Sequence, residues 1–261
     1  MSSPLYADDG GGGDATPVVC LHSLAGNTTQ WHETLAHLRS TRRAIAIDWR
    51  GHGKSATATD TNFDPAAVAE EIEQAIDAFG LEEFALVAHS AGAIMGLALV
   101  LRNPARIAGL VLVDPAGDSS RVPGEQTDAL LETLASDAYG KTIEAYWNVI
   151  LAGASDAAKE RVLADLRSTK QSTVVGVPTA LRDYDPLPAL ESYNGPTLAI
   201  ITRFNETPVS LHRLFPSLPH VTIAGTGHWP QIDQPHEFQN ILDEFLTRVD
   251  AIDGHASTLA Q

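Results

Sequence analysis

Residues 86–92 read Leu-Val-Ala-His-Ser-Ala-Gly and join a short apolar run to a stretch with helical character. A chain can turn this sharply from strand to helix only where the residues two before and two after the turn are small, and Ala88 and Gly92 meet that condition. The turn would lift the Ser90 hydroxyl above the sheet and set the Ala91 amide at a helix N-terminus, which favours negative charge. Alternatively, Ser90 merely caps the helix, because serine is a favoured N-cap residue.

The sequence on both sides of this stretch alternates short apolar runs with helix-like segments. Buried parallel strands are typically such runs bounded by turn residues, and they are expected at residues 18–21, 44–47, 84–87, 110–113, 198–201 and 221–223. The clearest helix begins with Asp64 and Pro65 and stops at Gly80, and the last helix begins at Pro235. The alternation predicts an α/β fold: a mostly parallel central sheet flanked by helices on both faces.

The alternation is interrupted between residues 118 and 189. This segment shows helical patterns, for instance at Leu130 and Leu134, and no clear strand. We therefore predict that residues 1–117 and 190–261 form one core domain and that residues 118–189 are inserted into it as a helical cap.

The composition excludes several classes of protein. The 261 residues carry 33 acidic and 17 basic side chains, a net charge of −16, so the surface would repel phosphate backbones and anionic lipids. Neither nucleic acid nor a membrane is therefore expected as a partner. Cys20 is the single cysteine, which rules out an intrachain disulfide and any metal site built on paired cysteines. The start of the sequence lacks the pattern of a secretory signal, so we expect a cytoplasmic protein.

Two segments resemble the α/β-hydrolase fold family. The nucleophile turn of that family is usually G-x-S-x-G, and residues 88–92 read Ala-His-Ser-Ala-Gly, with alanine in place of the first glycine. Residues 19–26, Val-Cys-Leu-His-Ser-Leu-Ala-Gly, resemble the family's strand and H-G-x-x-G loop, with serine in place of a glycine. The resemblance implies that Ser90 is the nucleophile and that the backbone amides of Leu24 and Ala91 form the oxyanion hole.

A third segment resembles the histidine loop of the same family. Residues 222–230 read Thr-Ile-Ala-Gly-Thr-Gly-His-Trp-Pro, follow the last expected strand and precede the final helix. The resemblance implies that His228 is the general base for Ser90. Residues 48–55, Asp-Trp-Arg-Gly-His-Gly-Lys-Ser, resemble a glycine-containing turn of the family that we interpret as structural.

The acid of a Ser-His-acid triad is left open at this point. In the family it usually follows the strand after the cap, where this chain has Asn205, an amide that cannot stabilise an imidazolium. Asp114 follows the strand before the cap, where some members of the superfamily carry their acid, and Glu206 is one residue beyond the usual place. We favour Asp114, with Glu206, and then Asn205 or a Ser-His dyad, as alternatives.

The resemblance implies a serine hydrolase that cleaves a carboxylic ester or lactone in a small-molecule substrate through an acyl-enzyme intermediate. No metal or organic cofactor is expected, and no oligomeric state is predicted. A carbon–carbon bond hydrolase for a diketone-like substrate, a cofactor-free oxygenase and a slow ligand receptor are alternatives on the same scaffold. The substrate pocket is expected between the sheet and the cap, with His89, Trp147 and Trp229 among its lining residues.

Overall fold

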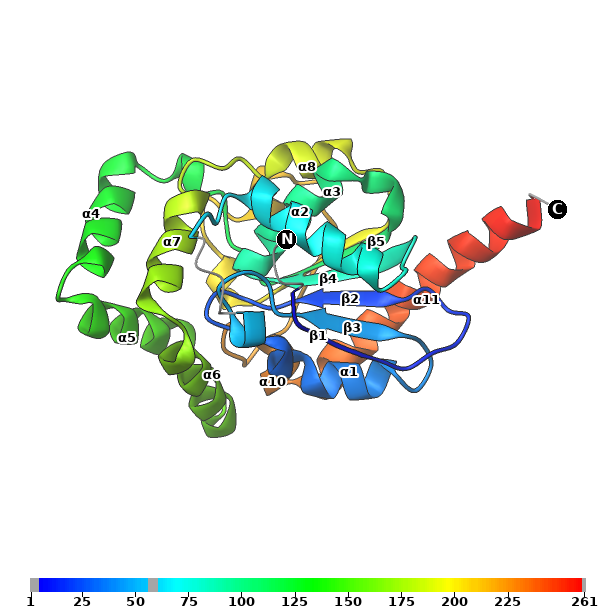
Figure 1. Cartoon of the computed structure of the whole chain (residues 1–261), viewed down its shortest axis with the longest axis horizontal. Coiled ribbons are helices and arrows are strands. Elements are labelled where there is room, and N and C mark those ends of the chain that lie inside the picture. Colours follow the sequence, from blue (N-terminus) through cyan, green and yellow to red (C-terminus); the bar gives the residue numbers. More distant parts are fainter. Residues whose placement is uncertain (1–4, 56–60, 260–261) are drawn as a thin grey trace.

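A mostly parallel sheet runs through the centre of the molecule, and a group of helices lies beside one end of it (Figure 1). The computed structural model describes residues 5–55 and 61–259. Within these residues the hydrogen-bonded strand order is β1-β3-β2-β4-β5-β6-β7, and all pairs are parallel except β1 with β3. The strands are β1 (Ala7–Gly10), β2 (Val18–Leu21), β3 (Ala44–Ile47), β4 (Phe84–His89), β5 (Ile107–Val113), β6 (Thr197–Ile201) and β7 (His220–Thr222).

The six strands expected from the sequence are confirmed, with ends that shift by up to three residues. Strand β1 is missing from the prediction because its residues, Ala-Asp-Asp-Gly, show no apolar alternation. It forms because its backbone pairs with β3 at the edge of the sheet, where its side chains stay partly exposed and need not be apolar.

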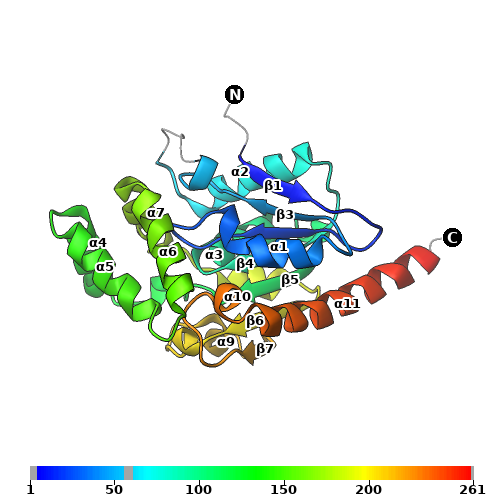
Figure 2. The same ribbon diagram turned by 90° about the horizontal axis from the view of Figure 1, so that it is seen from below.

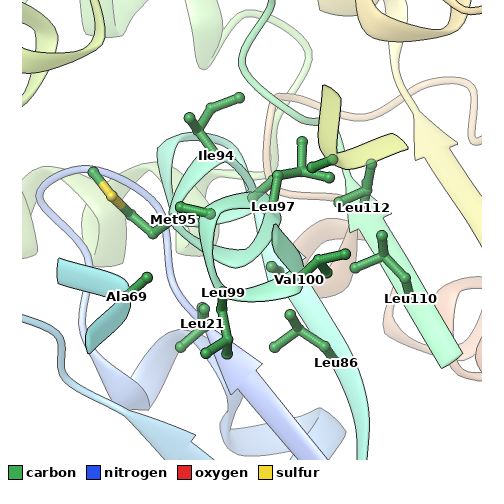
Figure 3. Packing of buried hydrophobic residues seen from close by; sticks show 14 of the residues in the cluster. Leu21, Ala69, Leu86, Ile94, Met95, Leu97, Leu99, Val100, Leu110 and Leu112 are labelled. Carbon is green, nitrogen blue, oxygen red and sulfur yellow. The ribbon is translucent and has the colours of Figure 1, made fainter. Parts of the chain in front are cut away.

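The two faces of the sheet carry separate apolar layers, because successive side chains of a strand point to opposite sides. In β4, Phe84 and Leu86 pack on one face and Ala85 and Val87 on the other. Helices α2 (Pro65–Ala78), α3 (Ala91–Arg102) and α8 (Leu187–Ser192) cover the first face, and α1 (His32–Leu38) and α11 (Pro235–Leu259) cover the second (Figure 1). Figure 3 shows side chains of α3 packed against Leu86 of β4 and Leu110 of β5. The predicted α/β architecture is therefore correct.

Helix α2 begins as its sequence predicts. The Asp64 carboxylate accepts hydrogen bonds from the amides of Ala66 and Ala67, and Pro65 occupies the first turn, where a missing amide proton is harmless. The helix ends just before Gly80, whose φ of 68° suits the left-handed conformation that closes many helices.

Four helices between β5 and β6 do not cover a face of the sheet but lie together at one end of the molecule (Figures 1 and 2). They are α4 (Gly124–Ala135), α5 (Tyr139–Ile150), α6 (Asp156–Ser168) and α7 (Gln171–Leu181), and we call them the cap helices. They share a small apolar core that also takes in Ala25 and Trp229 from loops of the sheet domain. The cap boundary expected at residue 189 falls inside α8, which packs against α3 over the sheet.

A polar contact joins the cap helices to the loop after β2. Asp165 of α6 accepts hydrogen bonds from Asn27 Nδ2 at 2.7 Å and from Gln30 Nε2 at 2.9 Å. The side-chain oxygen of Gln30, Oε1, accepts hydrogen bonds from Ser23 Oγ and from Trp229 Nε1, both at 3.3 Å. Gln30 therefore links a cap helix to two loops that border the carboxyl edge of the sheet.

The remaining short helices are α9 (Leu211–Leu214) and α10 (Pro230–Asp233), with single 3₁₀ turns between the longer elements. The thiol of Cys20 lies on β2 with no exposed surface, and burial raises its pKa. Among the helices of the described residues, none combines the length and apolar character that crossing a bilayer requires.

Candidate active site

Ser90 sits at a strained turn between β4 and α3. Its φ of 54° and ψ of −120° are unusual for a residue with a side chain, and its hydroxyl makes no capping hydrogen bond to the helix. A Cβ atom at Gly92 would lie 2.2 Å from the carbonyl oxygen of His22, so only glycine fits there. The turn thus has the small residue that the sequence argument required, and helix capping does not explain the serine.

His228 faces the Ser90 hydroxyl. Its Nε2 atom lies 2.8 Å from Ser90 Oγ. The backbone around the ring is fixed on both sides: the His228 amide donates to the carbonyl of Ile150 at 3.0 Å, and the His228 carbonyl accepts from His89 Nε2 at 2.7 Å. Asp233 adds a further constraint, because its carboxylate accepts hydrogen bonds from the Gly227 amide and the Thr226 hydroxyl.

Asp114 lies behind His228, at the carboxyl end of β5. Its Oδ2 atom is 2.5 Å from His228 Nδ1, and the residue is fully buried. Its φ of 37° is in the left-handed region, which aspartate tolerates better than most residues. The carboxylate also accepts hydrogen bonds from the Thr202 amide, the Thr202 hydroxyl and Asn205 Nδ2, each at 2.7 Å.

Asn205 and Glu206, the other two residues considered for the acid, do not contact His228 in this way. Asn205, at the usual position of the acid, is buried and donates its amide to Asp114. Glu206 is exposed and pairs with Arg213, whose guanidinium lowers the pKa of the Glu206 carboxyl. The structure therefore brings Asp114 and Asn205 to one point beneath His228 and leaves Glu206 on the surface.

Leu24 and Ala91 carry the two backbone amides that were expected to form an oxyanion hole. Residues 23–26 form a tight turn in which the Gly26 amide donates to the Ser23 carbonyl at 3.0 Å and Ala25 has a φ of 56°. Leu24 and Ala91 both line the cavity that contains Ser90. Within the described part of the chain neither amide donates a hydrogen bond, so both are available to an oxyanion.

A cavity of about 460 Å³ extends from Ser90 and His228 into the space between the sheet and the cap helices. Trp147 and Trp229, two of the three expected pocket residues, are among the residues that line this cavity. His89 is not among them. It is fully buried, with Nε2 on the His228 carbonyl and Nδ1 at 3.3 Å from Gln231 Nε2. Because adjacent side chains of a strand point apart, the residue before Ser90 supports the histidine loop instead of facing the substrate.

Two further histidines lie close to the site without reaching the cavity. His22 and His52 are buried, and His22 stacks on Trp49 with ring centroids 5.4 Å apart. Burial lowers the pKa of His22 to about 3 and lowers that of His52, so both rings are neutral. Their role is to pack the loops after β2 and β3.

Four residues around the site escaped the sequence analysis in these roles: Thr202 and Asn205 as donors to Asp114, Asp233 as the anchor of the histidine loop, and Gln30 as the link to the cap. Only Asn205 had a signal, since it occupies the expected place of the acid. The other three are single polar residues in loops, and nothing local in the sequence distinguishes them from solvated ones.

With this geometry described, comparison with known proteins identifies the family. Residues 16–235 match the sequence model of the alpha/beta hydrolase fold, and the chain belongs to that family. It is similar to the protein named "Putative carbamate hydrolase RutD" from Variovorax paradoxus, with 30% identity over 95% of this chain and 98% of the relative. It is also similar to the sn-1-specific diacylglycerol lipase ABHD11 of Mus musculus, with 27% identity over 90% of this chain and 82% of the relative.

Solved structures share the fold at lower sequence identity. The enol-lactonase of Burkholderia xenovorans superimposes with a TM-score of 0.78 and 19% identity, covering 93% of this chain and 96% of the enzyme. An esterase from Exiguobacterium antarcticum superimposes with a TM-score of 0.80 and 19% identity, covering 93% of this chain and 95% of the enzyme. At this level the likeness establishes the fold alone, while the family and the names of its members support a hydrolase.

Proposed function

We propose that this chain is a serine-dependent hydrolase of carboxylic ester or lactone bonds in a small-molecule substrate. The observation that carries the proposal is the continuous set of contacts from Asp114 Oδ2 to His228 Nδ1, at 2.5 Å, and from His228 Nε2 to Ser90 Oγ, at 2.8 Å, at one end of a cavity. A nucleophile, a base and an orienting carboxylate in this order define a triad by geometry, whatever their order in the sequence.

In the first half of the proposed reaction, Ser90 Oγ attacks the carbonyl carbon of the substrate while His228 Nε2 takes the hydroxyl proton. Asp114 holds the imidazole in the tautomer that leaves Nε2 free to accept, and it stabilises the imidazolium that forms. Collapse of the tetrahedral intermediate breaks the bond to the alcohol oxygen, and His228 returns the proton to that oxygen. The acyl group remains on Ser90.

The negative charge of the tetrahedral intermediate falls on the former carbonyl oxygen. The amides of Leu24 and Ala91 are proposed to hold it, and the N-terminal end of α3 adds a favourable dipole. Loss of one such donor typically costs a factor of about 10² to 10³ in kcat.

In the second half, water attacks the acyl carbon as His228 accepts one of its protons. The acyl–oxygen bond to Ser90 breaks, the proton passes to Ser90 Oγ, and the carboxylic acid leaves. A lactone follows the same steps, but its alcohol and acid groups leave as one molecule. Similarity to proteins named lipase, esterase and lactonase agrees with this reaction class.

Labelling with a fluorophosphonate, followed by peptide mapping, tests the proposal directly, because such probes react with activated serines. We expect the label on the peptide that contains Ser90, and turnover of 4-nitrophenyl acetate by the unmodified protein. Ser90→Ala should abolish both the label and the turnover. Ser119→Ala is the matched control, since Ser119 also lines the cavity but lies outside the triad, and this variant should keep the label. Turnover that survives in Ser90→Ala would overturn the proposed role of the serine.

A further inference from the structure

The cavity next to Ser90 has an unusual charge distribution for a protein as acidic as this one. The structure gives it 23 lining residues, and among these described residues there is no aspartate, glutamate, lysine or arginine. The chain as a whole carries a net charge of −16. The absence of formal charge is therefore a property of the cavity and not of the composition.

The inner wall of the cavity is apolar and buried. It is formed by side chains of three cap helices and by Trp229 of the histidine loop: Leu134, Ile143, Trp147, Val174, Val177 and Leu181. The polar lining residues outside the triad are neutral: Ser23, Ser119, Gln126, Thr127, Thr142 and Tyr146. Such a wall binds apolar groups of a ligand favourably, and each CH₂ that is buried against it raises the binding constant roughly fourfold.

Three arginines on segments that adjoin the cavity are already engaged. Arg121 pairs with Asp118 at 2.7 Å, Arg182 pairs with Asp128 at 2.8 Å, and Arg203 donates to the Ala152 carbonyl at 2.6 Å. None of the three lines the cavity. A carboxylate carried into the cavity by a substrate would therefore lose its hydration and find no lysine or arginine among the described lining residues.

The carboxylate of Asp114 lies directly behind the cavity. Its Oδ2 atom is 2.5 Å from His228 Nδ1, and His228 lines the cavity, so the field of a negative charge acts on a bound substrate. A second negative charge on the substrate would meet this field without compensation.

We propose that the cavity selects uncharged esters or lactones that carry an extended apolar group, and that it discriminates against a carboxylate on that group. The inference rests on the proposed function, because it concerns the substrate of the same serine. It specifies the part of the substrate that enters the space between the sheet and the cap helices.

Two series of neutral substrates test the apolar preference. In 4-nitrophenyl alkanoates from acetate to hexanoate the acyl chain grows, and in alkyl acetates from ethyl to hexyl the alcohol grows. We expect kcat/KM to rise about threefold to fourfold per added CH₂ in at least one series, and the series that rises identifies which half of the substrate enters the cavity. A flat or falling kcat/KM in both series would overturn the proposal.

A pair of esters that are similar in length but differ in charge tests the discrimination against a carboxylate. We expect 4-nitrophenyl hydrogen glutarate, which ends in a carboxylate, to be cleaved with a kcat/KM at least about 100-fold below that of 4-nitrophenyl pentanoate. Equal rates for the two esters would contradict a cavity that rejects charge.

A matched pair of variants assigns the discrimination to the cavity. Leu130 lines the cavity and is 44% exposed, whereas Leu101 of α3 is 43% exposed and lies outside it. A lysine at position 130 stays hydrated and adds a cation beside the substrate, so Leu130→Lys should raise the ratio of glutarate to pentanoate cleavage about twofold to fivefold. Leu101→Lys, with the same change in net charge, should leave the ratio unchanged. An equal shift in both variants would place the discrimination outside the cavity.

The results separate the two proposals. Labelling of Ser90 and turnover of 4-nitrophenyl acetate, without any preference for chain length or charge, would overturn the substrate class and leave the proposed function intact. Absence of both the label and the turnover would instead remove the proposed function itself.

Discussion

The loops that follow β5 and β6 begin side by side at the carboxyl edge of the sheet, but they carry different side chains. The first provides Asp114, a carboxylate, and the second provides Asn205, an amide, and the two are hydrogen-bonded at 2.7 Å. The expected position of the acid is in the second loop, whereas the carboxylate bonded to His228 comes from the first. The two neighbouring strand ends therefore bring polar side chains together below His228, and the one that contacts Nδ1 comes from the first loop.

The second loop supports the carboxylate of the first. Three donors from residues 202 and 205 bond the Asp114 carboxylate and fix its orientation toward the histidine. The first loop in turn accepts a left-handed backbone at Asp114, with a φ of 37°. The division between charge in one loop and orientation in the other can be tested by changing each loop separately.

The largest effect is expected from the loop that carries the charge. Asp114→Asn should lower kcat for 4-nitrophenyl esters by about 10³- to 10⁴-fold, a size taken from the corresponding exchange in a serine protease. The reason is that an amide can hold the wrong imidazole tautomer and cannot stabilise the imidazolium. Thermal unfolding would check that the variant is folded, and a folded variant with nearly full kcat would mean that Asp114 is not the acid.

Moving the carboxylate from one loop to the other is the next test. The double variant Asp114→Asn with Asn205→Asp restores a carboxylate within the same hydrogen-bonded pair. We expect kcat to recover about 10- to 100-fold over Asp114→Asn alone, with the remaining loss caused by the altered approach to His228. No recovery in a folded double variant would show that the two strand ends are not interchangeable.

Removing the orienting amide should have a smaller effect. Asn205→Ala leaves the carboxylate in place but deletes one of its donors, so kcat should fall about tenfold and the free energy of unfolding by about 1.5–3 kcal/mol. Steady-state kinetics and urea unfolding measure the two quantities. A loss as large as that of Asp114→Asn would mean that Asn205 does more than orient the carboxylate.

The smallest effect is expected at the neighbouring surface residue. Glu206→Gln removes a charge that pairs with Arg213 in solvent, so kcat should change by less than about twofold. The same assay serves for this variant, and a loss of an order of magnitude would return Glu206 to consideration as the acid.

The parts of the site that the sequence predicts are those fixed by local structure. The turn at Ser90 depends on small residues two positions away, and the His228 loop is marked by the glycines around it, so both can be identified within a few residues of sequence. Asp114 depends on the pairing of β5 with β6 across the intervening cap, a long-range register that no local pattern contains. The sequence therefore ranked the acids without deciding between them.

Two further differences have similar causes. His89 was expected to line the substrate pocket, but the alternation of side chains along β4 turns it under the histidine loop. Strand β1 has no apolar signal because its pairing comes from backbone hydrogen bonds at a sheet edge. The sequence alone shows neither the direction of the His89 side chain nor the pairing of β1 with β3.

The buried thiol of Cys20 gives this protein a practical advantage. It is the single sulfhydryl in 261 residues, and it has no exposed surface. Maleimides should therefore leave the thiol of the native protein unmodified. A cysteine introduced at Val149, which is 62% exposed on α5, would be the sole reactive attachment point for a fluorophore or spin label. Spectroscopy of the α4–α7 region during turnover would then need no prior removal of a background thiol.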